Sequence, residues 1–313
     1  MSEIVASGRR ALTVGSARAL ISMNFEPIDD LLARCYFPTD GAFHAAVSGG
    51  SDSLAMTMIA FSAGLNVEIW NLDHRIRPTS KAESAAVRGF GNWLGVPVHN
   101  FEAEVDDRNV EASARKVRRS YFPSNVSTGH TMDDQAETFI LNVLRGSGVD
   151  GLASMRPGPQ KPILNLRKMD TIAICKIFSL VPVEDESNLS DKYRRNRVRM
   201  EVIPLLSQIS NRDIVPVIAR SASVLRTDAD FIAELSRGIE TNNVKELLAL
   251  DGSVLARVLR QRVSNISGYP PSAKSIERLL SYLREKKSFS LQLEGKVVAK
   301  VKKGSVFFET LAD

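Results

Sequence analysis

The sequence contains few cysteines and no long apolar run. Among its 313 residues only Cys35 and Cys175 are cysteines, and they stand far apart without a CxxC or CxxH motif. This spacing argues against a disulfide framework and against a zinc or iron–sulfur site, and we expect both thiols to be buried. No stretch reaches the ~20 apolar residues of a spanning helix, and the N-terminus lacks the basic flank and apolar core of a secretion signal. We therefore expect a cytoplasmic protein with no membrane partner.

The composition is that of a folded protein with a mild excess of positive charge. Hydrophobic residues make up 43% of the chain, and 313 residues are typical of two domains. A net charge of +5 permits RNA binding without requiring it. Solvated helix faces are the ordinary explanation of basic runs, but here the charge is concentrated. The two runs are Arg115, Lys116, Arg118 and Arg119, and Lys192, Arg194, Arg195, Arg197 and Arg199.

A turn rich in glycine and serine follows the first apolar segment. Residues 43–47 are apolar enough for a buried strand, residues 54–61 have the apolar content of a helix, and Ser48–Ser53 lie between them. Gly49 and Gly50 let the backbone approach an anion, and the helix start offers unpaired N–H groups. Hydroxyl donors come from Ser48, Ser51 and Ser53. We interpret this turn as a cradle for the phosphates of ATP.

The cradle differs from the common phosphate-binding loop. The lysine of the GxxxxGK[ST] motif is missing, so we expect Asp52 to hold Mg²⁺ near the pyrophosphate. The alternative is a Gly-Ser turn that caps an ordinary helix through Ser51 or Asp52. A second glycine motif, Gly146, Gly148 and Gly151, follows a helix and not a strand, so it lacks the context of a dinucleotide site.

Strand and helix patterns alternate after the cradle, which predicts an α/β fold with an open parallel sheet and helices on both faces. Strands are expected over 67–72, 96–101 and 125–128, and helices over 81–94, 109–121 and 133–145. The last helix should turn Ala136, Phe139, Ile140, Val143 and Leu144 inward. Ligands of such sheets bind beyond the carboxyl ends of the strands, where Ser48, Asp73 and Gly129 fall.

The second half of the chain changes in pattern. Helices are expected over 169–180 and 193–206, with a strand start at Pro182 between them. We place a domain boundary near 207–212, which gives a catalytic domain over 1–210 and a smaller α+β domain over 211–313. That domain should contain helices over 214–237, 254–264 and 274–287, and strands over 289–308 with turns at Gly295 and Gly304. We expect it to take part in substrate recognition, by binding tRNA, or to form a homodimer, and a rigid spacer is the alternative.

Several phrases of the sequence together resemble one enzyme family. SGGSDS at 48–53 is similar to the signature of the PP-loop ATP pyrophosphatases, which split ATP into AMP and pyrophosphate. LDHRIRPTS from Leu72, GHTMDDQAETFILNVLRGSG from Gly129, PIL at Pro162, DESN at Asp185 and RRNRVRMEVIPLL from Arg194 follow in the order seen in tRNA(Ile)-lysidine synthetases. The resemblance covers about residues 40–207.

The resemblance implies a ligase that modifies tRNA(Ile) with a CAU anticodon. In this family the O2 of the wobble cytidine attacks the α-phosphate of ATP, and free L-lysine then displaces AMP at C2 to give lysidine. Asp134 and Glu137 are spaced i, i+3, so their carboxylates share a helix face and can grip one ammonium. We assign them lysine binding and amine deprotonation. The alternative is that both acids only favour a helix N-terminus.

The same resemblance assigns further residues to the crevice. Asp73, His74, Gly129 and His130 are expected at the nucleotide. Arg115 and Arg118 are expected to bind the lysine carboxylate or a phosphate, with Arg118 also catalytic, although Arg119 and Ser120 separate Arg118 from Tyr121. Arg195 and Arg199 are expected on ATP phosphates or the tRNA backbone.

Two other functions remain open from the sequence. One is another PP-loop ligase that thiolates or amidates its substrate, and the missing cysteine pairs and glutaminase domain disfavour it. The other is a non-catalytic nucleotide sensor, which would have no use for the acid pair Asp134 and Glu137.

Overall fold

The computed structural model describes residues 26–39, 41–73, 80–102, 120–183, 194–285 and 287–311. The chain divides into two compact units, which are described separately. Unit 1 comprises Met1–Leu144 and Ser154–Arg220, and unit 2 comprises Arg145–Ala153 and Ser221–Asp313. The functional division between residues 1–210 and 211–313 stays a prediction.

Unit 1 is built on a sheet of four parallel strands. These are β1 (Ala42–Ala46), β2 (Asn66–Asp73), β3 (Val98–Glu102) and β4 (Ser127–Thr128), in the order β3-β2-β1-β4. Ala46 pairs with Trp70 on one side and with Thr128 on the other, so three strands end at the same edge. The predicted parallel sheet is therefore confirmed. The strand order changes direction beside β1, and ligands of such sheets bind beyond the carboxyl ends of the strands at this point.

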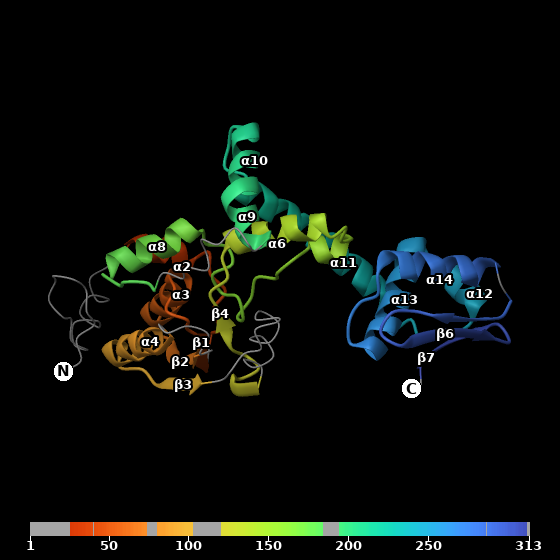
Figure 1. The fold of residues 1–313 in the computed structure, drawn as a ribbon, viewed down its shortest axis with the longest axis horizontal. Helices are drawn as coiled ribbons and strands as arrows, with labels where there is room; N and C mark the ends of the chain where they lie inside the picture. Colours follow the sequence, from red (N-terminus) through yellow and green to blue (C-terminus); the bar gives the residue numbers. More distant parts are fainter. Residues whose placement is uncertain are drawn as a thin grey trace. The chain divides into compact units, whose positions relative to one another are not determined.

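Three helices share one apolar core with the sheet. α3 (Ser51–Ser62), α4 (Ser80–Leu94) and α8 (Lys168–Ile177) contribute side chains to it, and the short α2 (Glu26–Leu32) packs at its margin. Figure 1 shows α8 alongside α3. α3 lies between the sheet and α8, so it is buried on most of its sides, and residues 53–60 are buried without interruption.

The opposite face of the sheet carries aromatic side chains. Trp70 stacks on His99 with ring centroids 4.2 Å apart and on Phe101 with centroids 5.7 Å apart. The indole nitrogen of Trp70 donates to His44 Nδ1 at 3.1 Å. The helix expected over 109–121 lies outside the described residues, apart from Ser120 and Tyr121, which are helical.

A second layer of helices in unit 1 carries acidic and basic side chains. α6 (Met132–Leu144) packs through Ala136 and Ile140 against Val198 and Val215. The prediction that Val143 and Leu144 point inward was wrong, because they are 53% and 70% exposed. The side chains that pack against α6 cover its N-terminal part, where Gln135 and Glu137 are buried, and leave Val143 and Leu144 exposed.

Residues 194–210 form one helical segment with a change of winding. α9 (Arg194–Arg197) continues into a π-helical turn over Val198–Val202 and then α10 (Ile203–Ser210). Pro204 at the start of α10 has no N–H, and its ring would clash with the carbonyl of Met200 in a continuous α-helix. The wider turn before Pro204 relieves that conflict. Upstream, residues 181–183 contain no strand, so the start expected at Pro182 was wrong for this described part.

Unit 2 combines helices with an antiparallel sheet. α11 (Val215–Ser236) runs from unit 1 into unit 2 and is followed by α12 (Val244–Leu248), α13 (Gly252–Ser267) and α14 (Ala273–Glu285). The strands β5 (Phe289–Gln292), β6 (Val297–Lys302) and β7 (Ser305–Thr310) pair in sequence order. α7 (Val149–Leu152) also belongs to this unit.

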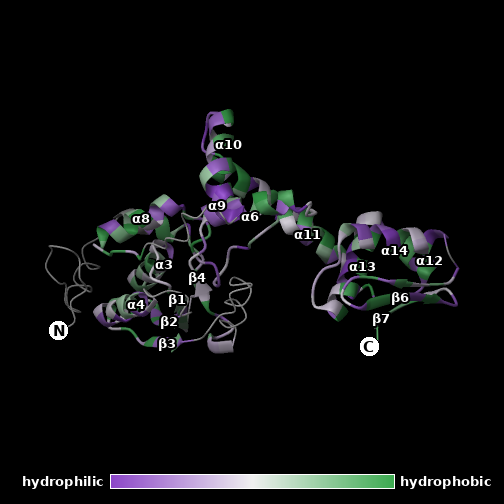
Figure 2. Ribbon diagram, viewed as in Figure 1, coloured by the Kyte–Doolittle hydropathy of each residue, from purple (hydrophilic) through white to green (hydrophobic). Residues whose placement is uncertain are grey.

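The expected turns of this second sheet are present. Gly295 and Gly304 adopt φ values of +70° and +78° between successive strands. Figure 2 shows β6 coloured mainly hydrophobic and α9 hydrophilic, in keeping with a buried central strand and a basic site helix. The α+β second part is therefore confirmed, whereas the short α12 was not expected. None of the described helices combines the length and hydropathy needed to cross a bilayer.

Candidate active site

The glycine and serine turn connects β1 to α3 at the edge of the parallel sheet. Gly49 has φ +90°, which favours glycine, and its carbonyl accepts a bond of 3.0 Å from the Val183 N–H. Ser53 Oγ donates to Gly50 O at 2.9 Å and lies 3.3 Å from the Ser48 nitrogen. The expected turn before a helix N-terminus is thus formed, with Ser51 in the first turn of α3.

A buried asparagine fixes the end of β1. Asn71, from β2, donates through Nδ2 to Val47 O at 2.7 Å, immediately before the turn. Its Oδ1 accepts from Ser84 Oγ at 3.0 Å. The sequence analysis missed Asn71, although it occupies an inward position in an otherwise apolar alternation. Asp73, two residues further on the same face, is 4% exposed at the end of β2.

The loop after β4 lies directly on the first turn of α3. A Cβ added to Gly129 would stand 2.8 Å from Asp52 C and 2.9 Å from both Asp52 O and Ser53 N. Glycine is therefore required by close backbone approach. Next to it, His130 Nδ1 lies 2.8 Å from Thr128 Oγ1. The structure thus brings Gly129 and His130 beside the cradle.

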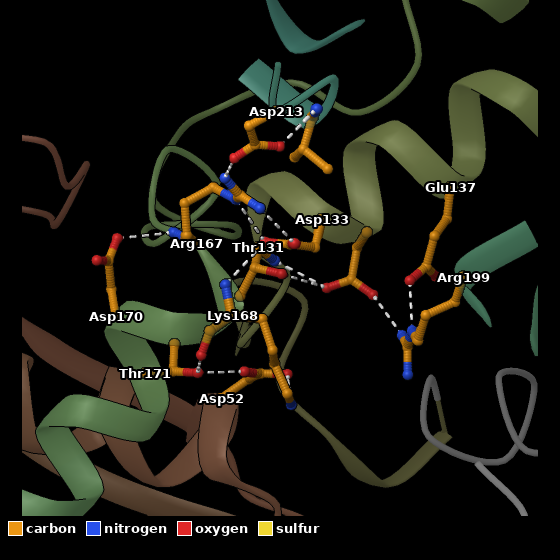
Figure 3. A network of polar contacts seen from close by, with 12 residues as sticks. Asp52, Thr131, Asp133, Glu137, Arg167, Lys168, Asp170, Thr171, Arg199 and Asp213 are labelled. Atoms are coloured by element: carbon orange, nitrogen blue, oxygen red, sulfur yellow. Dashed lines mark hydrogen bonds and ion pairs between the residues drawn. The ribbon is translucent and has the colours of Figure 1, made fainter. Parts of the chain in front are cut away.

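Asp52 contacts the start of α8. Its Oδ2 lies 2.7 Å from Lys168 Nζ, and its Oδ1 accepts from Thr171 Oγ1 at 2.6 Å (Figure 3). Asp52 is also the second residue of α3, where the helix dipole favours an anion. The sequence analysis did not include Lys168 or Thr171, because they come from an element 116 and 119 residues away in the chain.

Asp133 links the starts of α6 and α8. Its Oδ2 accepts from the Lys168 N–H at 2.7 Å, and its carboxylate receives two bonds of 3.1 Å from the Arg167 guanidinium. Arg167 also pairs with Asp213, as Figure 3 shows. The Arg167 N–H in turn donates to Asp170 at 2.8 Å, which caps α8. Lys168 is therefore fixed at its backbone.

The predicted acid pair faces two arginines. Glu137 is 0% exposed and accepts from Arg195 Nε at 2.7 Å and from Arg199 Nε at 2.5 Å. Asp134 Oδ1 accepts from Arg195 Nη2 at 2.9 Å. The i, i+3 spacing thus places both carboxylates around one cation, and that cation is the guanidinium of Arg195. Because two carboxylates meet two guanidiniums, the cluster is close to neutral.

Asp134 has a second set of bonds that keeps it charged. Its Oδ2 accepts a hydrogen bond from the Thr131 N–H at 2.8 Å. Asp134 is the third residue of α6 and Thr131 is the residue before this helix, so the bond caps the start of α6. Burial raises the pKa of Asp134, but the Thr131 bond and the charge of Arg195 outweigh it and lower the pKa below 3.8. The charge of Asp134 therefore stabilises the folded state. This contribution is fully present at pH values above 3.8, the pKa of the residue in the unfolded chain, and is lost as the pH falls through the lowered pKa of the folded state.

The two cysteines do not form a reactive pair. Cys175 is buried in α8, lies 3.5 Å from Ser51 O, and has its pKa raised to about 12 by burial and then by the charge of Asp52. Cys35 is only partly buried, contrary to expectation, and burial likewise raises its pKa to about 12. Neither thiol is a thiolate at neutral pH.

Three predicted site residues lie outside the described residues. These are His74, Arg115 and Arg118, and their expected roles stay predictions. The other predicted positions all belong to unit 1, where Asp52 lies in the first turn of α3 and Asp134 and Glu137 lie at the start of α6. The contact of Gly129 with the backbone of Asp52 joins the loop before α6 to the cradle, whereas the chemical roles stay predictions.

Comparisons with known proteins agree with this fold. A family model described as a PP-loop domain matches residues 26–206. The tRNA(Ile)-lysidine synthase of Symbiobacterium thermophilum is 30% identical over 279 residues, covering 75% of this chain and 58% of that protein. The enzyme of the same name from Mycolicibacterium paratuberculosis is 35% identical over 231 residues, covering 69% of this chain and 72% of that protein. The enzyme of the same name from Gloeobacter violaceus is 32% identical over 273 residues, covering 79% of this chain and 84% of that protein.

Among solved structures, the U34-tRNA thiolase NcsA from Methanococcus maripaludis has a TM-score of 0.52 at 16% identity, covering 67% of this chain and 80% of that one. This likeness concerns the fold alone. The fold and the matched domain define a PP-loop protein that binds ATP. More narrowly, the chain belongs to the tRNA(Ile)-lysidine synthase family of ATP-dependent ligases. The family predicted from the motifs is thereby confirmed.

Proposed function

We propose that this chain joins free L-lysine to C2 of the wobble cytidine of tRNA(Ile) with a CAU anticodon, in the cytoplasm. The reaction proceeds through an adenylated base and gives lysidine, AMP and pyrophosphate. The family assignment supports this activity, although the chain spans only 58% of the length of the Symbiobacterium relative.

One observation carries the proposal more than any other: the acid pair, with Glu137 buried and Asp134 partly buried, lies in the same unit as the phosphate cradle. Asp134 and Glu137 start the helix that follows Gly129, and Gly129 lies against the first turn of α3. An amine held by the acids and a nucleotide in the cradle would therefore approach each other across one short loop. A nucleotide sensor would need only the cradle.

In the adenylation step, the cradle would bind the phosphate tail of ATP. Ser48, Gly49, Gly50, Ser51 and Ser53 would supply backbone and hydroxyl donors to charge that develops at the phosphates. Asp73 and His130 would lie at the nucleotide from the neighbouring strand ends. The cytidine O2 attacks the α-phosphorus, the bond to pyrophosphate breaks, and pyrophosphate leaves.

Asp52 fits a role in binding Mg²⁺. Magnesium is usually bound by one or two carboxylates together with substrate phosphates, and Asp52 stands at the phosphate cradle. No group of three metal-ligating side chains occurs among the described residues, so the phosphates would complete the coordination. The ion would neutralise phosphate charge and orient the tail. In the structure Asp52 is instead paired with Lys168.

Replacing Asp52 by asparagine tests the metal role. We expect D52N to release pyrophosphate about 100-fold more slowly in the presence of tRNA and Mg²⁺, because the neutral amide binds the ion poorly. A pyrophosphate-coupled assay measures this rate. The exposed Asp228 of α11 provides the control, and D228N should match the unchanged protein. A normal rate for D52N would remove Asp52 from the metal site.

In the second step, the acid pair would bind the lysine ε-ammonium. A new cation can enter only if a guanidinium leaves, because Arg195 and Arg199 occupy the carboxylates. Both arginines are about one-third exposed, at 35% and 37%, so they can turn towards phosphate or tRNA. With the arginines displaced, two adjacent carboxylates raise each other's basicity and accept the proton of the amine. The free amine then attacks C2, and AMP leaves.

We propose that unit 2 contacts the tRNA backbone. A hollow of about 460 Å³ in this unit is lined by Arg237, Arg257 and Arg260, together with Gln261 and Ser264. Arginine suits phosphate because its fork of donors matches the oxygens. Arg257 and Arg237 are paired with Asp150 and Glu234, which limits the net charge of the hollow. Homodimer formation through unit 2 is the alternative.

A lysine-transfer assay tests the proposed function. Incubation with ATP, Mg²⁺, labelled lysine and bulk bacterial tRNA should place label in acid-insoluble RNA, and omission of ATP should prevent this. Nuclease digestion should then release the label as a modified cytidine. ATP binding without transfer would favour the sensor, and ATP cleavage that depends on another acceptor would favour a different PP-loop ligase.

A further inference from the structure

The sequence of the cradle contains no cation of its own. From Cys35 to His74 the chain has neither lysine nor arginine, although this stretch includes all of β1, the turn and α3. A bound ATP tail would meet helix dipole and hydroxyl donors there, but also the negative charge of Asp52. The like charges repel each other unless a cation comes from elsewhere.

Lys168 reaches this place from α8. Its Nζ lies 2.7 Å from Asp52 Oδ2, and Figure 3 shows it extended from α8 towards α3. Its backbone is held, since its N–H donates to Asp133 at 2.7 Å and α8 packs on α3 through Ile174 and Cys175. The backbone of Lys168 is therefore held beside the cradle by the core.

The ammonium itself has freedom to move. The Lys168 side chain is 42% exposed, whereas its neighbour Arg167 is 19% exposed and bound to two carboxylates. A lysine is a point charge on a flexible stem, so it can exchange one anion for another nearby. Asp52 keeps a second partner in Thr171 Oγ1 at 2.6 Å when the ammonium leaves.

We propose that Lys168 supplies the cation that the cradle lacks, and that its ammonium moves from Asp52 to the phosphate tail when ATP binds. The exchange frees one oxygen of Asp52 for the metal ion. The inference rests on the ATP-binding part of the proposed function and is independent of lysine transfer.

Binding measurements on the full chain test this role. Isothermal titration is carried out with ATP, inorganic pyrophosphate and adenosine, in EDTA and without tRNA or lysine. For K168A we expect the Kd of ATP and pyrophosphate to rise about tenfold, the effect of losing one charge-assisted bond, while the Kd of adenosine stays unchanged. K168R should keep most of the affinity, because it keeps the charge.

Two further variants separate this role from a structural one. Lys176 lies exposed in the last turn of the same helix, and K176A should bind all three ligands normally. D52N should bind metal-free ATP more tightly, by a few-fold, because it removes an anion from the site and releases the Lys168 ammonium.

The inference is overturned if K168A binds ATP and pyrophosphate as the unchanged protein does. It is also overturned if adenosine affinity falls equally with a lower melting temperature, or if D52N weakens metal-free ATP binding. Failure of the proposed function gives a different result: phosphate binding still depends on Lys168, but no lysine enters RNA.

Discussion

Lysine incorporation by a Glu137→Gln variant is expected to need a 10- to 100-fold higher lysine concentration, with pyrophosphate release nearly unchanged. The glutamine keeps the shape and one acceptor oxygen but loses the charge and the second acceptor, and a bond between a charged pair contributes ~1.5–3 kcal/mol. The measurement is the KM for lysine at saturating ATP and tRNA, with pyrophosphate release followed in parallel. An unchanged KM would mean that Glu137 serves only to hold the arginines.

The alanine variant at the same position should fail for another reason. Glu137 is 0% exposed and bonds both Arg195 and Arg199, so E137A leaves two guanidiniums with Asp134 alone. Removing one partner of a buried ion pair costs about 3–5 kcal/mol, and the partial exposure of the arginines places this variant at the lower end. Denaturant unfolding measures the loss.

Glu201 provides the matched control for both variants. It accepts two bonds from Arg197 on the same helical segment, at 3.0 and 2.9 Å, but this pair is exposed. E201Q and E201A should leave the lysine KM and the free energy of unfolding nearly unchanged. Equal effects at Glu137 and Glu201 would assign both to general helix stability.

Gly129→Ala is expected to reduce ATP affinity strongly and to destabilise unit 1. The added Cβ would stand 2.8–2.9 Å from the backbone of Asp52 and Ser53. Because the clash is with backbone atoms, rotation of a side chain cannot relieve it. The first turn of α3 must therefore shift, and overpacking of this kind costs about 1–3 kcal/mol. Titration with ATP and thermal unfolding measure the two effects.

Gly148 is the control for the glycine prediction. It has φ −76°, and a Cβ there would meet nothing within 4 Å, so G148A should bind ATP normally. The two variants therefore compare a glycine that touches the backbone of the cradle with a glycine whose added Cβ would touch nothing. Normal ATP binding by G129A would show that the turn adapts, and would contradict the close approach described above.

The fold was predictable where one pattern dominates a segment. β2 alternates buried and partly buried positions, α13 and α14 have apolar residues at helical spacing, and Gly295 and Gly304 mark hairpins. The end of α6 was not predictable, because Val143 and Leu144 continue the apolar period without a partner to cover them. The helical repeat of apolar residues shows which face of the helix a residue occupies. Tertiary contacts decide how far along the helix that face is buried.

The site was predictable where its residues are close in sequence. Ser48–Ser53 and the Asp134, Glu137 pair each lie within one turn and one helix, so spacing alone brings them together. Lys168 and Asn71 come from other elements, and only the packing of α8 and β2 against α3 brings them to the cradle. The pairing of Arg195 with the acids likewise depends on the tertiary fold.

Pro204 gives the basic segment an unusual sensitivity to length. The π-helical turn before it sets the rotation at which α9 joins α10, while Arg195 and Arg199 remain bonded to Glu137. Deleting one residue between Arg199 and Pro204 would turn Arg195 and Arg199 by about 100° relative to α10 and detach them from the acids. Relatives of this chain should thus tolerate exchanges of side chains in this stretch far more readily than insertions or deletions.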